Sequence, residues 1–427
     1  MQGSFKMIEW ARNTNIYEVN VRQYTDEGTF RAFATHLPRL REMGVEVLWF
    51  MPITPISQLN RKGSLGSYYA CCDYCAINPE FGTLDDFKSL VKGAKLMGFK
   101  VIIDWVANHT GWDHVWTKSN PDFYKKDEKG SFRSPFPDWE DTLQLDYTNP
   151  QLRNAMISAM KFWLKECDID GFRCDMAHLV PLDFWKEARL QLEKTKPLFW
   201  LAETEDPAYH AVFDATYGWE LLHIMEKYSR GEVQMNMIDS ILHRYTEKFS
   251  STALRAYFTS NHDENSHSGT EYERMGDAAV PFAVLCATWT NAVPLVYSGQ
   301  ELPVMKQRIK FFDHDPIKWA PTFAMHDFYR RIFFLRKSNA ALLAGDEDVR
   351  TFRIDTSDNS RIFSFLKKKG DDEVLVILNL SNTATIGKLK GSLLQGDFID
   401  LFTESAETPG PDTVLDLPPW GYKILYK

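Results

Sequence analysis

Short apolar runs alternate with longer helical patterns along most of the chain, and this alternation constrains the fold more than any other feature. Each run is rich in β-branched or aromatic residues, which is typical of a buried strand. Strands that alternate with helices predict a parallel sheet built from βα units. The candidate strands are Ile16–Val21, Glu46–Met51, Val101–Trp105, Asp170–Arg173, Leu198–Ala202, Ala211–Asp214, Ala256–Thr259 and Val293–Tyr297. Eight such units predict an α/β protein with a closed (β/α)8 barrel, the TIM barrel.

The segments between these strands have the periodicity of helices packed on a sheet. Phe30, Phe33 and Leu37 recur at helical spacing, as one buried helix face requires. We expect helices at Phe30–Met43, Leu84–Met97, Leu152–Cys167 and Pro181–Lys194.

Residues 278–299 carry no charge and are numerous enough to span a bilayer. Pro281, Asn291 and Pro294 interrupt this stretch. We therefore interpret it as a buried helix followed by an inner barrel strand, and we expect no membrane span.

Two segments depart from the βα pattern. Residues 110–145 are polar, contain the charge run Lys125–Lys129, and are expected to form a short inserted subdomain B on the catalytic face after strand three. After residue 340 the pattern changes to short strands, at Arg350–Ile354, Ile362–Lys367, Glu373–Leu380, Phe398–Leu401 and Gly421–Tyr426. We expect residues 1–109 and 146–340 to form the barrel, and residues 341–427 to form a C-terminal all-β sandwich domain.

Composition excludes several classes of protein. The 427 residues are 44% apolar and 25% charged, as in soluble globular enzymes. The net charge is −9 and no basic stripe is present, so nucleic-acid binding is not expected. The six cysteines lack the spacing of a zinc ribbon and are expected to be free thiols, which favours a reducing compartment. Residues Met1–Trp10 contain no apolar core of a signal peptide, so we expect a cytoplasmic protein. If a signal peptide has been removed from this sequence, a periplasmic or secreted protein is the alternative.

Carboxylates follow several of the predicted strands. Active sites of such barrels form at the C-terminal ends of the strands, where Asp104, Asp175, Glu203 and Asp263 would meet. Arg173 and Asp175 lie two residues apart and so face the same way on a strand. A neighbouring guanidinium is expected to lower the pKa of Asp175 and keep it ionised, as a nucleophile must be.

Glu203 follows a buried apolar run, Leu198–Ala202. An apolar setting and nearby carboxylates both raise the pKa of a Glu. A Glu of raised pKa that faces an ionised Asp is the division of labour of glycoside hydrolysis. Taken singly, each residue has a structural explanation: an ion pair for Asp175, and a helix cap for Glu203 or Asp263.

Several sequence strings occur in order at successive strand ends. They are Asp104-Trp105-Val106-Ala107-Asn108-His109, Gly171-Phe172-Arg173-Cys174-Asp175, Glu203 and Phe258-Thr259-Ser260-Asn261-His262-Asp263. Supporting strings are Asp73-Tyr74, Asn78-Pro79-Glu80-Phe81-Gly82-Thr83, Leu145-Asp146-Tyr147-Thr148-Asn149-Pro150 and Gly299-Gln300-Glu301. With these strings the chain resembles the α-amylase family, glycoside hydrolase family thirteen, over nearly its whole length.

The resemblance implies roles for individual residues. Asp175 matches the nucleophile, Glu203 the general acid/base, and Asp263 the third essential carboxylate. Four further residues match substrate-binding positions of the family. Tyr69 matches a Tyr that stacks on the sugar, and His109 and His262 match histidines that bind the sugar's hydroxyls. Arg173 matches the Arg beside the nucleophile. The implied function is that of a retaining glycoside hydrolase. Its expected substrates are α-glucosidic bonds, mainly α-1,4, in maltooligosaccharides and starch-type glucans.

The chain also departs from the family's pattern. Leu143-Gln144-Leu145 stands where calcium-binding members often carry Pro-Asp-Leu, so an acidic oxygen ligand is missing. We expect no required metal or organic cofactor, and calcium is doubtful. Met176 does not match the residues that the family uses for a strict α-1,4 or α-1,6 preference, and His178 lies one position earlier than the matching His of many members. The contacts with the sugar beyond the cleaved bond therefore stay open, and so does the choice between α-1,4 and α-1,6 linkages.

Four alternatives stay open at this stage. The first is a transglycosylase or isomerase of the same family, such as a glucanotransferase or a trehalose-forming enzyme, and the second an α-1,6-acting glucosidase. The third is a metal-dependent barrel hydrolase, which would need a His-x-His pair near strand one, where His36 is the only histidine before His109. The last is a non-catalytic binding protein, against which the three carboxylates argue. The oligomeric state is unknown.

Overall fold

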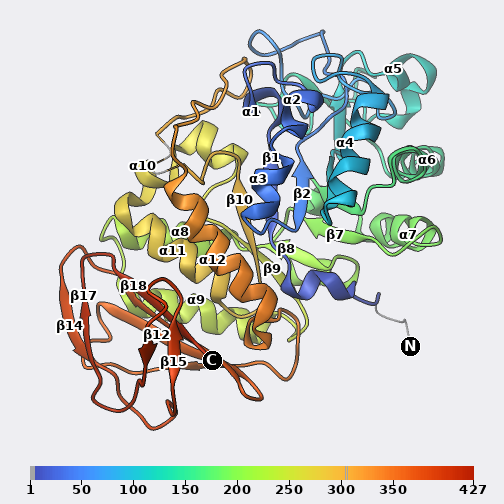
Figure 1. The fold of residues 1–427 in the computed structure, drawn as a ribbon. Coiled ribbons are helices and arrows are strands. Elements are labelled where there is room, and N and C mark those ends of the chain that lie inside the picture. The colour runs from blue at the N-terminus through green and yellow to red at the C-terminus, as the bar shows by residue number, and fades with distance from the viewer. Residues whose placement is uncertain (1–4, 303, 305) are drawn as a thin grey trace.

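A computed structural model describes residues 5–302, 304 and 306–427, and a closed barrel of parallel strands forms its centre (Figure 1). In sequence order the barrel strands are β1 (Ile16–Val19), β2 (Val47–Phe50), β3 (Lys100–Trp105), β6 (Gly171–Cys174), β7 (Phe199–Ala202), β8 (Ala215–Tyr217), β9 (Leu254–Tyr257) and β10 (Ala292–Tyr297). Each strand pairs with the next, and β10 pairs with β1 to close the barrel. The predicted TIM barrel is confirmed.

The sixth predicted strand, Ala211–Asp214, is wrong. Residues Pro207–Ala211 form a 3-10 helix that Asp206 caps by accepting a hydrogen bond from the backbone of Ala208. The carboxylate of Asp214 accepts a hydrogen bond from the backbone N–H of Trp200 at 2.9 Å. The first hydrogen bond holds the chain in a helical turn, and the second ties Asp214 to the neighbouring strand β7, so the strand begins afterwards, at β8.

Helices lie between the strands and after the last barrel strand, and most of them surround the barrel (Figure 1). They are α1 (Val21–Tyr24), α2 (Phe30–Ala34), α3 (Leu37–Glu42), α4 (Leu84–Leu96), α5 (Val115–Ser119), α6 (Pro150–Cys167), α7 (Leu182–Leu192), α8 (Trp219–Ser229), α9 (Met235–Lys248), α10 (Glu271–Met275), α11 (Ala279–Thr288) and α12 (Ala324–Ser338). The predicted helix Phe30–Met43 is divided into α2 and α3. Pro38 lacks the N–H that a continuous helix would use at this point, so the helix restarts at Leu37.

Helix α4 shows how the sequence sets a helix and its buried face. Thr83 and Asp86 form a capping box, in which each side chain accepts a hydrogen bond from the other residue's backbone N–H. Phe87, Leu90 and Val91 then bury one face of the helix. Helix α4 contacts β3 and α6, which places it on the outer wall of the barrel.

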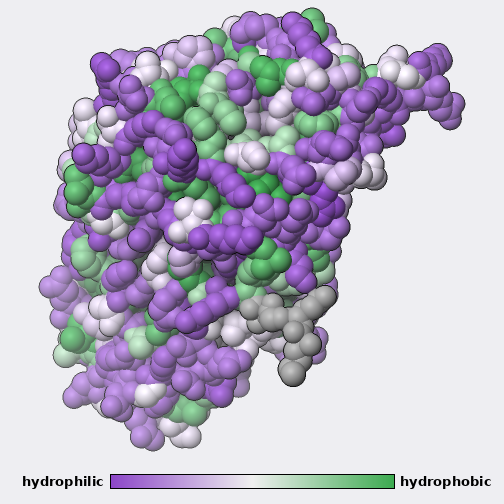
Figure 2. Space-filling view, turned by 90° about the vertical axis from the view of Figure 1, so that its right-hand side faces the viewer, coloured by the Kyte–Doolittle hydropathy of each residue, from purple (hydrophilic) through white to green (hydrophobic). Residues whose placement is uncertain are grey.

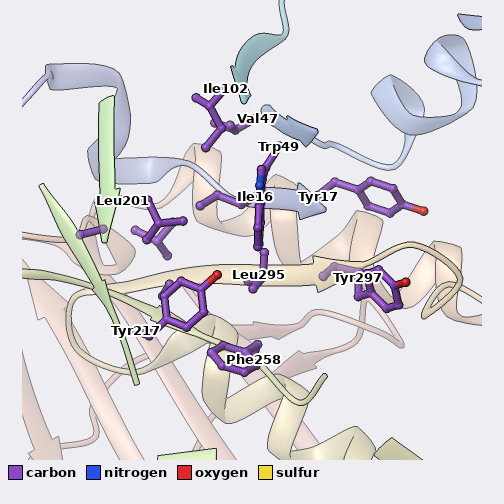
Figure 3. Packing of buried hydrophobic residues seen from close by; sticks show 14 of the residues in the cluster. Ile16, Tyr17, Val47, Trp49, Ile102, Leu201, Tyr217, Phe258, Leu295 and Tyr297 are labelled. Carbon is purple, nitrogen blue, oxygen red and sulfur yellow. The ribbon is translucent and has the colours of Figure 1, made fainter. Parts of the chain in front are cut away.

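The interior of the barrel changes character along its axis. Apolar side chains fill part of it, and Figure 3 shows Trp49 close to Ile16 and Leu295. Glu18 lies two residues after Ile16 on β1 and is fully buried, so it points to the same side of the strand. Asp104 on β3 is in register with Arg173 on β6. The strands therefore carry buried charges toward their C-terminal ends.

The chain between β3 and α6 leaves the barrel and returns to it. It contains a short antiparallel hairpin, β4 (His109–Gly111) paired with β5 (Thr142–Gln144). This excursion corresponds to the predicted inserted segment, and its exact limits stay a prediction.

The C-terminal region is an antiparallel β-domain, drawn in red at the lower left of Figure 1. A six-stranded sheet has the order β11 (Arg350–Arg353), β12 (Ile362–Lys369), β13 (Asp372–Asn379), β18 (Tyr422–Tyr426), β15 (Phe398–Asp400) and β16 (Ala406–Glu407), and β14 (Thr385–Lys388) pairs with β17 (Val414–Leu417). All five predicted strands occur here. Prediction missed β14, β16 and β17 because they are short and half-exposed. Trp289 at the end of α11 packs on Phe365 of β12, which joins the domain to the barrel.

The uncharged stretch 278–299 forms α11 and β10, as predicted, and most of it is buried. Across the described residues, none of the helices combines the length and apolar character needed to cross a membrane. Hydrophilic residues cover most of the face in Figure 2, with hydrophobic residues in smaller groups between them.

Candidate active site

The three predicted carboxylates meet in one cavity of about 280 Å³ at the C-terminal end of the barrel. Asp175 directly follows β6, Glu203 directly follows β7, and Asp263 lies on the loop after β9. The other lining residues are Lys62, Ser67, Tyr69, His109, Asp138, Trp139, Asp141, Thr142, Met176, His267, Phe311 and Phe312. Residues far apart in the sequence thus form a single pocket with acidic and aromatic walls.

Arg173 lies under this pocket and contacts two of its carboxylates, Asp175 and Glu203, together with the buried Asp104. Its Nη1 is 3.1 Å from Oδ1 of Asp175 and 3.0 Å from Oδ1 of Asp104, and its Nη2 is 2.9 Å from Oε2 of Glu203. Its Nε donates a hydrogen bond to the hydroxyl of Tyr217. The guanidinium is fully buried, and one cation therefore joins three carboxylates.

The pKa of Asp175 is raised well above its usual value, contrary to the expected lowering by Arg173. Burial is the main cause and the negative charge of Glu203 the second, and both outweigh the opposing charge of Arg173. Burial also raises the pKa of Asp104 to about 6, although Arg173 opposes it. One guanidinium is shared among three carboxylates, and its charge does not offset the burial of Asp175, which therefore retains a proton to higher pH than an exposed Asp would.

The backbone at Met176 fixes Glu203. Met176 has a left-handed φ of 41°, which is rare for a residue with a long side chain. Its N–H donates a 2.8 Å hydrogen bond to Oε2 of Glu203. The sharp turn after Asp175 therefore directs a donor at the neighbouring carboxylate, in a conformation of the kind found at functional sites.

A second buried network supports the opposite wall. Nδ1 of His262 lies 2.5 Å from Oε1 of Glu18, and its Nε2 lies 2.8 Å from the hydroxyl of Tyr69. Tyr69 in turn donates to Asp104 at 3.1 Å. Burial favours the neutral imidazole, but the charges of Asp263 and Glu18 outweigh it and raise the pKa of His262 to about 9. The ring of Tyr69 stacks on that of His262 with centroids 5.4 Å apart.

The four predicted substrate-binding residues occupy two levels. Tyr69 and His109 line the cavity, and burial lowers the pKa of His109 to about 3, so its ring is neutral. Arg173 and His262 lie beneath the lining, fully buried, and hold the residues above them. Direct contact of these two with a substrate stays a prediction.

Sequence reasoning missed several residues of the site. Glu18 was detectable, because it is a charged residue inside an apolar predicted strand. Trp139 comes from the inserted segment and packs edge-on against His109, with centroids 5.2 Å apart. Phe311 stacks on Tyr69 from the loop after β10. No periodicity marks residues in such loops, so the sequence gives no signal for them.

Among the residues that the structure describes, no group of three His, Cys, Asp or Glu side chains is arranged to hold an ion. Gln144, at the position where an acidic ligand is missing, lies half-buried at the end of β5. The side-chain nitrogen of Asn108 lies 3.3 Å from Nδ1 of His109. Calcium prefers a shell of oxygen ligands, and the expectation that no metal is required stays a prediction.

Comparison with known proteins gives the family. A model of the α-amylase catalytic domain matches residues 11–139 and 136–375, and a model of the maltogenic amylase C-terminal domain matches residues 352–424. A noncanonic maltogenic α-amylase from Thermotoga neapolitana has a similar structure, with a TM-score of 0.88 and 29% identity over 97% of this chain and 98% of its own.

Two curated relatives extend the comparison. An α-amylase of Dictyoglomus thermophilum is 26% identical over 95% of this chain and 75% of its own length. An α-1,4-glucan:maltose-1-phosphate maltosyltransferase of Rhodospirillum rubrum is 26% identical over 87% of this chain, which spans only 58% of that protein. The fold, the ordered motifs and these matches agree: the chain belongs to the α-amylase family and is a glycoside hydrolase of glycoside hydrolase family thirteen.

Proposed function

We propose that this protein hydrolyses α-glucosidic bonds, mainly α-1,4, in maltooligosaccharides and starch-type glucans with retention of the α configuration. The observation that carries the proposal is the contact of one buried guanidinium, Arg173, with both Asp175 and Glu203 in a cavity that Asp263 also lines. A retaining mechanism needs two carboxyl groups about 5–5.5 Å apart. A shared guanidinium is a means of holding two such groups close together.

In the first step, a carboxylate oxygen of Asp175 attacks the anomeric carbon of the sugar. The bond from that carbon to the bridging oxygen breaks, and Glu203 gives its proton to the departing oxygen. In the second step, Glu203 takes a proton from water, whose oxygen attacks the anomeric carbon and releases Asp175. Two inversions leave the configuration unchanged.

The mechanism requires one proton on the Asp175–Glu203 pair at the start. Burial and the charge of Glu203 raise the pKa of Asp175, so Asp175 keeps a proton to higher pH than an exposed Asp does. The reactive form has the proton on Glu203 and the negative charge on Asp175. The hydrogen bond from the Met176 N–H holds the carboxyl group of Glu203 in position to act as the acid. Asp263, whose side chain is 40% exposed, is free to bind sugar hydroxyls.

The choice of α-glucan rests on the walls of the cavity and on the relatives. Tyr69, Trp139 and Phe311 offer ring faces for the apolar faces of sugars, and the carboxylates offer acceptors for hydroxyls. The relatives' names include a maltogenic α-amylase. The proposed mechanism uses no metal or organic cofactor.

A time course of products from maltoheptaose, pullulan, isomaltose and trehalose tests this function. We expect rapid cleavage of maltoheptaose to shorter maltooligosaccharides, and slow or no cleavage of isomaltose and trehalose. Failure to consume maltoheptaose, with turnover of isomaltose instead, would replace the α-1,4 assignment by an α-1,6 one.

Transfer to a sugar acceptor is the second candidate, and the similarity to a maltosyltransferase favours it. The covalent intermediate is the same, and only the molecule that attacks it differs. In the same time course, a transferase would produce chains longer than maltoheptaose. With maltose added as a fifth substrate, a trehalose-forming isomerase would convert it without releasing glucose. We expect neither to dominate at low substrate concentration.

A further inference from the structure

A second hollow, of about 680 Å³, lies between the barrel helices and the C-terminal β-domain. We name it the interdomain groove. One wall is the end of α8, the start of α9 and the turn between them, and the other is formed by loops of the β-domain. Its lining residues are Tyr228, Ser229, Gly231, Val233, Gln234, Met235, Asn236, Asn359, Ser360, Leu380, Ser381, Asn382 and Trp420.

The lining of the interdomain groove is uncharged, although one residue in four of the whole chain is charged. Amides, hydroxyls and two aromatic rings supply its chemistry. The side-chain amides of Gln234, Asn236 and Asn382 make no hydrogen bond to any part of the chain that the structure describes. Each amide therefore has donors and an acceptor free for a ligand. Such a surface suits a neutral ligand with many hydroxyl groups and apolar ring faces.

Trp420 holds an unusual backbone conformation at the edge of this groove. Its φ is 53°, in the left-handed region that a bulky residue rarely adopts, although Gly421 stands next to it. The surrounding turn enforces the conformation, because the Trp420 N–H donates to the carbonyl of Ser381 at 2.9 Å and Asn379 donates to the carbonyl of Pro418 at 2.7 Å. Strain that the structure maintains in this way is typical of ligand-binding positions.

The two walls are fixed to each other. The hydroxyl of Tyr228, on α8, donates a 2.7 Å hydrogen bond to the carbonyl of Leu380 in the β-domain. This hydrogen bond crosses between the two parts of the molecule inside the groove itself. The groove is therefore formed before any ligand arrives, which reduces the ordering cost of binding.

We propose that the interdomain groove is a second carbohydrate-binding site, separate from the catalytic cavity, that holds part of an α-glucan chain. Trp420 would stack on a sugar ring, and the free amides of Asn236 and Asn382 would bind its hydroxyls. The groove has no carboxylate in its lining and so performs no cleavage. The choice of an α-glucan among neutral carbohydrates rests on the proposed function.

Electrophoresis through gels that contain amylose tests this site. The full-length protein carries Asp175→Asn in every sample, so the polymer is not degraded during the run. We expect Trp420→Ala to weaken retention by amylose about threefold to tenfold, the loss of one ring stacked on a sugar. Ile386→Ala is the matched control, because Ile386 is a 73% exposed apolar residue of the same domain outside the groove.

A second variant protects the test against misfolding. Asn236→Ala combined with Asn382→Ala removes two exposed amides without touching the strained turn, and it should also weaken retention. Unchanged retention in both variants, or an equal loss in Ile386→Ala, would overturn the proposed site.

Turnover of maltotriose by the otherwise native protein separates this proposal from the proposed function. A ligand this short needs only the catalytic cavity, so Trp420→Ala should leave its turnover unchanged. If the native protein cleaves neither maltotriose nor maltoheptaose but amylose retention still depends on Trp420, the proposed function fails and the second site stands.

Discussion

The catalytic cavity and the interdomain groove both combine aromatic rings with polar groups, but they differ in charge. Five carboxylates and Lys62 line the catalytic cavity, and Arg173 lies beneath it. The lining of the interdomain groove contains no charged residue. A site that breaks a bond must stabilise charge as it develops, whereas a site that only holds a sugar needs neutral donors and acceptors.

This difference has an energetic consequence. Burying a carboxylate is costly, and the raised pKa values of Asp175 and Asp104 reflect that cost. Arg173 offsets part of it, so the catalytic end depends on a few essential contacts. The interdomain groove buries no charge and depends on no single ion pair. We therefore expect large effects of substitution at the first site and small ones at the second.

The largest expected effect is on activity. Asp175→Asn removes the attacking oxygen charge, and we expect kcat for maltotriose to fall by about 1,000-fold or more while the circular dichroism spectrum stays unchanged. Asp122→Asn, the same change at an 85% exposed carboxylate that does not line the cavity, should retain full activity. A variant of Asp175 that keeps a tenth of the activity would refute its assignment as nucleophile.

The next effect is on stability. Arg173→Met leaves three carboxylates buried without their shared cation, and we expect the free energy of unfolding to fall by about 3–5 kcal/mol at pH 8. Without Arg173 the pKa values of Asp104 and Asp175 should rise further, so protonation should recover part of the loss at pH 5. Urea denaturation at the two pH values measures both. A loss that is equal at pH 5 and pH 8 would mean that the carboxylates are not its cause.

His262 should give a pH-dependent effect of intermediate size. Its pKa rises from 6.5 to about 9 in the folded protein, so it stabilises the fold fully below about pH 6.5, and this contribution is lost as pH rises through 9. The contribution is roughly 3 kcal/mol. His262→Asn should therefore lose less stability than the native protein between pH 6.5 and 9. Parallel stability curves for the two proteins would contradict the charged His262–Glu18 pair.

The smallest expected effect concerns Trp420. Glycine tolerates a left-handed φ, so in Trp420→Gly the relief of backbone strain opposes the loss of packing. We expect the free energy of unfolding to change by less than about 1 kcal/mol while retention by amylose falls. A loss above about 3 kcal/mol in urea denaturation would make Trp420 a structural residue rather than a ligand-binding one.

The sequence predicted the parts of this molecule that repeat or that follow strands. Strand ends put Asp175, Glu203 and Asp263 on one rim, because consecutive parallel strands end on the same side of the barrel. Phe311 and Trp139 lie in loops whose paths depend on tertiary contacts, so no local sequence pattern predicts that they line the cavity. The interdomain groove joins α8, α9 and the β-domain, and only the packing of these parts brings its residues together.

The sequence also misjudged one quantity at a position that it placed well. It paired Asp175 with Arg173, as the structure does, but it inferred a lowered pKa from that pair alone. Burial and the neighbouring Glu203 act in the other direction and prevail. The number of carboxylates that share one cation depends on the assembled site. The spacing of two residues along the chain does not reveal this number.

Mass spectrometry of a trapped intermediate tests the central claim most directly. A 5-fluoro-α-glucosyl fluoride has an activated leaving group, and its ring fluorine slows the second step, so the covalent enzyme should accumulate. After digestion, we predict one glycosyl unit attached to the peptide that contains Asp175. Its attachment to Asp263 or Glu203, or turnover that inverts the configuration with no adduct at all, would contradict the account.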